Sequence, residues 1–369
     1  MPDAKRDWED YVAHERARIV PLLAAQGITL DVEQPQTIGE RYLTRPVGSG
    51  RKVVFFGRQK DGARVVVKTS SELQGKDELL HEKRVHEMLT HIRFAYGTFA
   101  LPEILRFDKE QGLLVTEHIE QEKSFLERPL EEQFTIALDA FKVQERAHAT
   151  TAEHWTALEH LMTSHAYYIK PGEYRKISAY SRDLLGLLAQ GTAAYEKLDT
   201  LTDRTIDAVS AYETALERYD GFLTHWDFTP QNFRIKDGTL YLLDLTSMRF
   251  GNKYESWARF INFMTLYNPA LARALVEYVR LNRTEDETQA LRIMRAYRLL
   301  ELIRYYATWL GKTTGDTRAL AEARIAFWTD VLEAVLDDRE VPAATIETYK
   351  EKRDALRTAD EKKRQVGLH

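Results

Sequence analysis

Strand-forming and helix-forming segments are separated along this chain of 369 residues, and that separation limits the possible folds. Runs rich in β-formers dominate from about residue 40 to 70 and return near residues 101 to 119. From Leu130 onward the apolar residues recur at helical spacing, and the main interruption falls at residues 221–246. The pattern predicts an α+β protein with a small antiparallel-sheet lobe, a larger and mostly helical lobe, and a boundary near residue 120.

The interruption at residues 221–246 contains an ordered set of polar residues. The stretch His225-Trp226-Asp227-Phe228-Thr229-Pro230-Gln231-Asn232 is followed by the alternating segment Phe233-Arg234-Ile235-Lys236. Asp237-Gly238 is a strong hairpin-turn signal, and Thr239 to Asp244 returns as a second strand. Because a tight hairpin brings the outer ends of its strands together, we expect Asn232 and Asp244 to lie on one side.

Two carboxylates and one amide suit a divalent metal in this arrangement, since Mg²⁺ prefers hard oxygen ligands. An Asp, an Asn five residues later and an Asp twelve residues after that is the spacing with which kinases hold magnesium and the phosphoryl acceptor. We therefore predict that Asp227 orients an acceptor hydroxyl and that Asn232 and Asp244 bind the metal. The alternative is an ordinary loop and hairpin that happens to contain polar residues.

A lysine at the end of an upstream strand is the expected phosphate ligand. Lys68 ends the apolar run Arg64 to Lys68, and Val66 of the same run is a further predicted nucleotide contact. Glu82 lies fourteen residues later in a predicted helix, beside its apolar face, and is expected to pair with Lys68. Glu78 and Glu87 are alternative partners, and a surface lysine with a solvated glutamate is the plainer interpretation.

Two further segments are expected to contact a nucleotide. In Val47-Gly48-Ser49-Gly50 the glycines would let backbone N–H groups, that of Ser49 included, approach phosphate oxygens, although such a sequence also makes ordinary turns. The apolar run Leu113 to Ile119 leads into polar sequence at the position of a kinase hinge. There Glu117 and Ile119 are expected to offer backbone groups to the adenine edge.

Together these residues resemble the aminoglycoside phosphotransferase and choline kinase superfamily, the small-molecule branch of the protein-kinase-like fold, over roughly residues 38 to 310. The segment Gln144 to Ala149 is similar to a helix end of that family. The resemblance implies a two-lobed kinase-like fold, ATP and Mg²⁺ as cofactors, a small-molecule hydroxyl acceptor, Asp227 as the base and His225 as a support of the catalytic loop.

The extent of the resemblance, the shift from strand to helix pattern near residue 120 and the charged C-terminal residues divide the chain into four segments. Residues 1–37 are an N-terminal helical extension, 38–119 the nucleotide-binding lobe, 120–345 the helical lobe with catalytic loop and acceptor site, and 346–369 a charged tail. Residues 4–26 in particular read as an amphipathic helix.

The chain departs from the family pattern at three positions. Trp226 stands where the family often has Gly, and Thr229 replaces a residue that is Lys in protein kinases and often His in antibiotic kinases. Ser256 stands where an Asp is frequent, with Glu255 as a possible substitute for it. These changes leave open a non-catalytic, kinase-like nucleotide-binding regulator. A protein kinase is less favoured, because no Ala-Pro-Glu motif or long peptide-docking segment follows Asp244.

Composition excludes several other classes of protein. With no cysteine, disulfides, zinc thiolates and cysteine nucleophiles are ruled out, and a net charge of -5 gives no general attraction for nucleic acid. No apolar run approaches a membrane span and the charged N-terminus lacks a secretory segment, so we expect a cytoplasmic protein without a membrane partner.

The acceptor and the oligomeric state are not determined by these patterns. A predicted helix over 298–310 carries Glu301, Tyr305, Tyr306 and Trp309, which could bind a cationic amine such as choline, ethanolamine or an aminoglycoside. The alternative is that these aromatic residues only pack.

Overall fold

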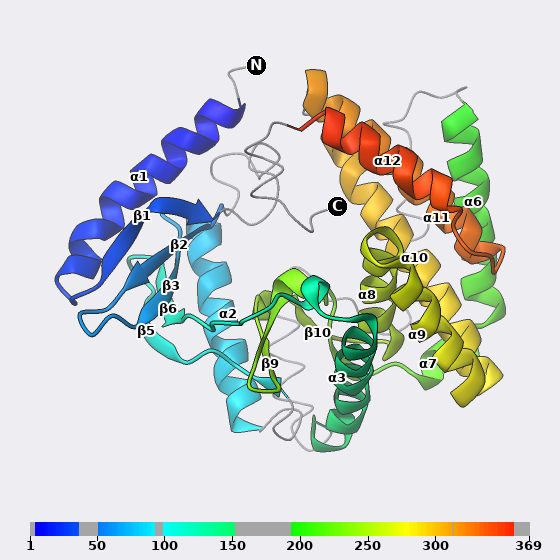
Figure 1. Cartoon of the computed structure of the whole chain (residues 1–369), viewed down its shortest axis with the longest axis horizontal. Helices are drawn as coiled ribbons and strands as arrows, with labels where there is room; N and C mark the ends of the chain where they lie inside the picture. The colour runs from blue at the N-terminus through cyan, green and yellow to red at the C-terminus, as the bar shows by residue number, and fades with distance from the viewer. Residues whose placement is uncertain (1–3, 37–50, 93–98, 152–192, 312, 358–369) are drawn as a thin grey trace. The chain divides into compact units, whose positions relative to one another are not determined.

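The computed structural model describes residues 4–36, 51–92, 99–151, 193–311 and 313–357. The chain divides into two compact units. The sheet unit comprises residues 1–122, 233–246 and 364–368, and the helical unit comprises residues 123–232, 247–363 and 369. The expected α+β class, with an antiparallel sheet followed by mostly helical sequence, is confirmed (Figure 1).

The sheet unit is built on five antiparallel strands in the order β1-β2-β3-β6-β5. Their bounds are Thr29–Gln36 (β1), Val53–Arg58 (β2), Arg64–Thr69 (β3), Leu113–Glu117 (β6) and Ile104–Asp108 (β5). Val54 lies opposite Lys68 in the β2–β3 ladder, and Lys68 lies opposite Leu114 in the β3–β6 ladder. Central position in a paired sheet fixes the backbone that carries Lys68.

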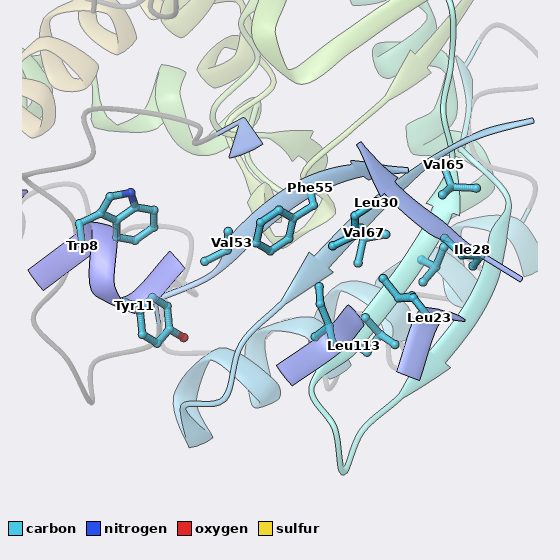
Figure 2. Packing of buried hydrophobic residues seen from close by; sticks show 12 residues of the cluster. Trp8, Tyr11, Leu23, Ile28, Leu30, Val53, Phe55, Val65, Val67 and Leu113 are labelled. Carbon is cyan, nitrogen blue, oxygen red and sulfur yellow. The ribbon is translucent and has the colours of Figure 1, made fainter. Parts of the chain in front are cut away.

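Alternate residues of β2 and β3 face different environments. Val53 and Phe55 on β2 and Val65 and Val67 on β3 are fully buried, whereas Val54, Phe56, Val66 and Lys68 are half-buried or exposed on the opposite face. Helix α1 (Ala4–Ala24) covers the buried face with Trp8, Tyr11 and Leu23 (Figure 2). Ile19 of the same helix belongs to the same buried cluster. Helix α2 (Leu73–His91) packs beside β3 and β6.

Polar contacts fix α1 to the sheet as well. The Tyr11 hydroxyl donates to the carbonyl oxygen of Arg51 at 3.0 Å. Glu15 is fully buried and accepts from Thr69 Oγ1 at 3.0 Å and from the Ser71 N–H at 2.9 Å. Burial alone would raise the pKa of Glu15, but these bonds and the charge of Arg18 lower it. The buried carboxylate therefore stays ionised and holds the end of β3.

The N-terminal segment differs from the expected helical extension over residues 1–37. The helix ends at Ala24, and Thr29–Gln36 forms the edge strand β1, paired with β2. Leu30 is buried in the sheet core while Thr29 is exposed, the alternation of a half-buried strand. The first part of the strand-rich stretch expected from about residue 40, residues 40–50, lies outside the described residues.

The predicted hairpin is present. Strands β8 (Phe233–Lys236) and β9 (Thr239–Leu242) pair with Phe233 opposite Leu242, and β4 (Phe99–Ala100) adds a short parallel pairing to β9. Asp237 and Gly238 both have positive φ, 50° and 73°, as a two-residue primed turn requires. These strands belong to the sheet unit although the chain reaches them from the helical unit.

The helical unit contains eight described α-helices and one two-stranded ladder. The helices are α3 (Leu130–Thr151), α6 (Ala193–Ala211), α7 (Glu213–Arg218), α8 (Tyr254–Tyr267), α9 (Pro269–Asn282), α10 (Glu285–Leu310), α11 (Gly315–Leu336) and α12 (Ala343–Ala355). The ladder pairs β7 (Phe222–His225) with β10 (Met248–Gly251), antiparallel. His148 of α3 stacks on Phe222 at 4.2 Å, so this part of the Gln144–Ala149 segment packs against β7, the strand that precedes the predicted catalytic loop.

Large aromatic side chains fill the core of this unit, among them Trp257 and Phe141, whose rings stack at 4.2 Å. Helix α12 lies largely within the expected tail 346–369, yet it buries Ile346 and Tyr349; residues 358–369 lie outside the described part. Among the described helices none is both long enough and apolar enough to span a membrane.

Candidate active site

The loop that follows β7 carries the predicted base. β7 ends at His225, the turn runs through Trp226 and Asp227, and a 3-10 helix covers Pro230–Asn232. The Trp226 N–H donates to the Ser247 carbonyl at 2.9 Å, and Ser256 Oγ donates to the His225 carbonyl at 3.0 Å. His225 itself is fully buried, which suits a supporting role beneath the loop.

Both carboxylate oxygens of Asp227 accept hydrogen bonds. Asn232 Nδ2 donates to Asp227 Oδ2 at 2.9 Å and to the Asp227 carbonyl at 2.8 Å, and Arg259 Nε donates to Asp227 Oδ1 at 2.8 Å. The Asn232 N–H also bonds to the Thr229 carbonyl at 2.9 Å. These bonds fix the rotamer of Asp227, and because Nδ2 of Asn232 is used inward, Oδ1 is the atom of that amide able to bind a cation.

Two arginines that sequence reasoning missed hold Trp226. The guanidinium carbons of Arg249 and Arg298 lie 5.1 Å and 5.0 Å from the centre of the indole ring, and Arg298 Nη2 donates to the Trp226 carbonyl at 2.8 Å. Cation–π contacts and the carbonyl bond thus anchor the residue before the base. No local motif marks Arg298, which lies 72 residues along the chain from Trp226.

Glu255 does not replace the missing acid at position 256. It is buried and bonds Arg249 at 2.9 Å and 3.2 Å through both carboxylate oxygens. Burial would lower the pKa of Arg249, but the Glu255 carboxylate outweighs that effect and raises it. Glu255 therefore contacts Arg249 and Thr224 of β7, whereas Ser256 contacts the carbonyl of His225.

Lys68 of β3 forms an ion pair with Glu82 of α2, the partner preferred from the sequence. A second pair is built the same way: Lys52, just before β2, lies 3.2 Å from Glu78, one helical turn before Glu82. Glu87, the other alternative, pairs with Lys83 at 2.6 Å. The sequence signal for Lys52 is its register, since it precedes by two residues Val54, which lies opposite Lys68.

Asp244 follows β9 and has a left-handed backbone, with φ of 51°. Its Oδ1 accepts from Thr246 Oγ1 at 2.7 Å. Burial would lower the pKa of Lys52, but the carboxylates of Asp244, Glu78 and Glu82 outweigh it and raise that pKa. The sheet unit thus gathers two lysines and three carboxylates, whereas Asp227 and Asn232 belong to the helical unit.

Three of the four remaining predicted nucleotide contacts, Val66, Glu117 and Ile119, lie in the described part of the sheet unit. Val66 is half-buried on the same sheet face as Lys68, and Ser49 lies outside the described residues. The Glu117 N–H donates to the Glu103 carbonyl at 3.0 Å, and the His118 N–H donates to the Arg64 carbonyl at 3.1 Å. Ile119, next along the chain, is buried.

The aromatic residues of α10 favour the packing alternative. Tyr306 and Trp309 are buried, and the Arg324 guanidinium lies 5.0 Å and 5.7 Å from their ring centres. Glu301 forms an ion pair with Arg298. An internal arginine therefore already lies over two of the three aromatic rings proposed for a cationic acceptor, whereas Tyr305 is exposed.

No protein family and no curated protein matches the chain in sequence. Solved structures match it in fold. A GDP complex of a variant aminoglycoside 2'-phosphotransferase-IIIa has a TM-score of 0.58 at 13% identity, covering 88% of this chain and 97% of that one. Aminoglycoside phosphotransferase APH(4)-Ia gives 0.56 at 13% identity, covering 87% and 98%. Amicoumacin kinase hAmiN, in complex with AMP-PNP and Ca²⁺, gives 0.50 at 13% identity, covering 90% and 97%.

These comparisons confirm the fold implied by the resemblance. Coverage of nearly the whole length of each solved chain shows that the similarity extends through both the sheet-rich and the helical parts. The chain has the two-lobed, protein-kinase-like fold of small-molecule phosphotransferases. One fold supports many reactions, and the residues of the site determine which reaction takes place.

Proposed function

We propose that this protein is a Mg²⁺-dependent phosphotransferase that moves the γ-phosphoryl group of ATP to a hydroxyl of a small molecule. The observation that carries the proposal is the contact between Asp227 and Asn232. One rigid turn holds a carboxylate by the amide nitrogen of a residue whose amide oxygen suits a metal. The fold shared with small-molecule phosphotransferases supports it.

Residues of the sheet unit would hold the nucleotide. Lys68, kept in place by Glu82, would bind the α/β-phosphates, and Lys52, kept in place by Glu78, would add a second positive charge. Val66 would contact the base and Ser49 the phosphates. Since the amides of Glu117 and His118 are used within the sheet, the Glu117 carbonyl and the Ile119 N–H are the groups we assign to the adenine edge.

The proposed metal ligands fit Mg²⁺ by their chemistry. Asn232 Oδ1 and the Asp244 carboxylate are hard oxygen donors, and two protein ligands are typical for Mg²⁺, which takes its other ligands from phosphate and water. The left-handed backbone conformation of Asp244 costs energy in a non-glycine residue. Such strained conformations are common at functional sites.

When bound, Mg·ATP would supply the transferable phosphoryl group and the charge that neutralises the leaving ADP. Asp227 would orient the acceptor hydroxyl and accept its proton. The acceptor oxygen forms a bond to the γ-phosphorus, and the bond to the β–γ bridging oxygen breaks with its electron pair left on ADP. Asn232 and Arg259 would hold Asp227 throughout.

The site favours a small acceptor over a protein. Residues 245–253 alone separate Asp244 from the start of α8 at Tyr254, too few for a peptide-docking segment. Two of the solved relatives are named for aminoglycosides and one for amicoumacin, so hydroxylated, amine-bearing metabolites are the first acceptors to try. A non-catalytic regulator, motivated by Thr229 and Ser256, is the second candidate.

Replacing Asp227 tests the assignment. Asp227→Asn keeps the shape of the side chain but removes the proton acceptor, so we expect transfer to fall by about 10³-fold. Asp237→Asn is the matched control, because Asp237 lies exposed in the β8–β9 turn, where Asn also tolerates positive φ. ADP release and product mass would be measured over a panel of hydroxylated metabolites, with Mg·ADP affinity by calorimetry.

The outcomes separate the candidates. Loss of transfer with retained Mg·ADP affinity supports Asp227 as the base. Full turnover by Asp227→Asn refutes that assignment. Wild-type protein that binds Mg·ATP but phosphorylates no metabolite favours the regulator, and phosphate found only on added proteins favours a protein kinase.

A further inference from the structure

Arg259 occupies an unusual position on α8. The residues from Tyr254 to Leu266 are buried, and Arg259 is only slightly more exposed than the others. Its side chain is 12% exposed and places Nε 2.8 Å from Asp227 Oδ1. The charged group of a nearly enclosed helix residue thus lies at the carboxylate proposed as the base.

Arg249 and Arg298 contact Trp226, but the other polar residues near Asp227 in the loop offer no charge to its carboxylate. Thr229, two residues after Asp227, is uncharged and only 3% exposed, so it supplies no cation to the site. Asn232, the other residue bonded to the Asp227 side chain, is neutral. Among the described contacts of the Asp227 carboxylate, Arg259 is the cationic one.

A phosphoryl group in transfer gathers negative charge on its equatorial oxygens beside a carboxylate that is itself negative. A fixed cation next to that carboxylate lowers the energy of the transition state, and guanidinium is suited to phosphate because its charge is permanent and its donors are planar. We propose, resting on the phosphotransferase function above, that Arg259 is the transition-state cation of this enzyme. It would contact the transferring phosphoryl group while its Nε bond holds Asp227.

The role predicts a selective effect on the transition state. Arg259→Met should lower kcat by about 10²-fold to 10³-fold while the KM for ATP changes by less than about 3-fold. Arg259→Gln retains an N–H donor for Asp227 but no charge, so it should show nearly the same loss. Arg259→Lys retains a point charge and should recover part of the rate.

Equilibrium binding supplies a readout apart from turnover. We expect wild-type protein to bind Mg·ADP with fluoroaluminate, which mimics the planar phosphoryl group, at least about 10-fold more tightly than Mg·ADP alone. Arg259→Met and Arg259→Gln should lose that gain yet keep Mg·ADP affinity within about 3-fold. Arg280→Met is the matched control, since Arg280 on α9 is exposed and pairs with Asp338 and Glu277.

The result that overturns the inference is a Gln variant with wild-type kcat and an undiminished gain from fluoroaluminate. Equal losses of Mg·ADP and fluoroaluminate binding would overturn it too, by showing a merely structural role. Circular dichroism and melting temperature identify variants that fail to fold. If Arg259→Met and Arg259→Gln fail to fold, the same kcat and fluoroaluminate measurements are made on Arg259→Lys. If wild-type protein shows neither transfer nor the fluoroaluminate gain, the proposed function fails instead.

Discussion

Glu287 joins the start of α10 to the start of α8. Its Oε1 accepts from Lys253 Nζ at 2.6 Å and from the Tyr254 hydroxyl at 2.9 Å. Its Oε2 accepts from the Thr284 N–H at 3.1 Å, and the Thr284 hydroxyl caps α10 in return. Because α8 carries Ser256 and Arg259 and α10 carries Arg298, this junction supports the helices that hold the catalytic loop.

The pKa of Glu287 gives the size of the effect. Burial would raise it, but the bond and charge of Lys253 and the Thr284 N–H lower it from 4.5 to about 2. That difference corresponds to roughly 3 kcal/mol of stability, since each pH unit is worth about 1.4 kcal/mol. A depressed pKa means that this stability is complete above about pH 5 and is lost as the pH falls toward 2.

Glu287→Gln should therefore lower the free energy of unfolding by about 3 kcal/mol at pH 7, and the deficit should shrink steadily between pH 5 and 3. Urea unfolding followed by tryptophan fluorescence measures it, with Glu285→Gln as the control on the exposed side of the same turn. A deficit below about 1 kcal/mol at pH 7, or one independent of pH, would refute the reasoning.

Two further predictions concern the core and the nucleotide. Phe141→Ala removes a fully buried ring stacked on Trp257 and should cost about 3 to 5 kcal/mol in urea unfolding; a loss under about 1 kcal/mol would contradict that packing. Lys52→Met should weaken Mg·ADP binding by about 10-fold in calorimetry because the charge proposed to bind phosphate is lost, whereas exposed Lys60→Met should not; equal affinities would remove Lys52 from the proposed site.

Local sequence was sufficient to predict those features whose geometry depends on neighbouring residues. A two-residue hairpin turn requires positive φ at both positions, which Asp237-Gly238 adopts readily, so the hairpin and its strands could be predicted directly. The Lys68–Glu82 pair could be anticipated because a strand end and a helix face are both periodic features. The edge strand β1 was missed, since short strands at an edge carry weak signals and gain stability mainly from pairing.

Residues that act from distant elements could not be predicted. Arg259 and Arg298 carry no motif, and each meets the catalytic loop only because α8 and α10 pack around it. Lys52 carries no motif, and its place near Lys68 follows from the pairing of β2 with β3. The aromatic residues of α10 suggested a ligand site, but an arginine from α11 lies over Tyr306 and Trp309.

The sequence by itself determined the division into a strand-rich part and a helix-rich part, the hairpin turn and the spacing of Asp227, Asn232 and Asp244, because these depend on backbone preferences and on short separations along the chain. The tertiary structure decided which charges meet. Lys52 with Glu78 and Arg259 with Asp227 are brought together by packing of elements far apart in sequence, and burial of their helices makes those contacts specific.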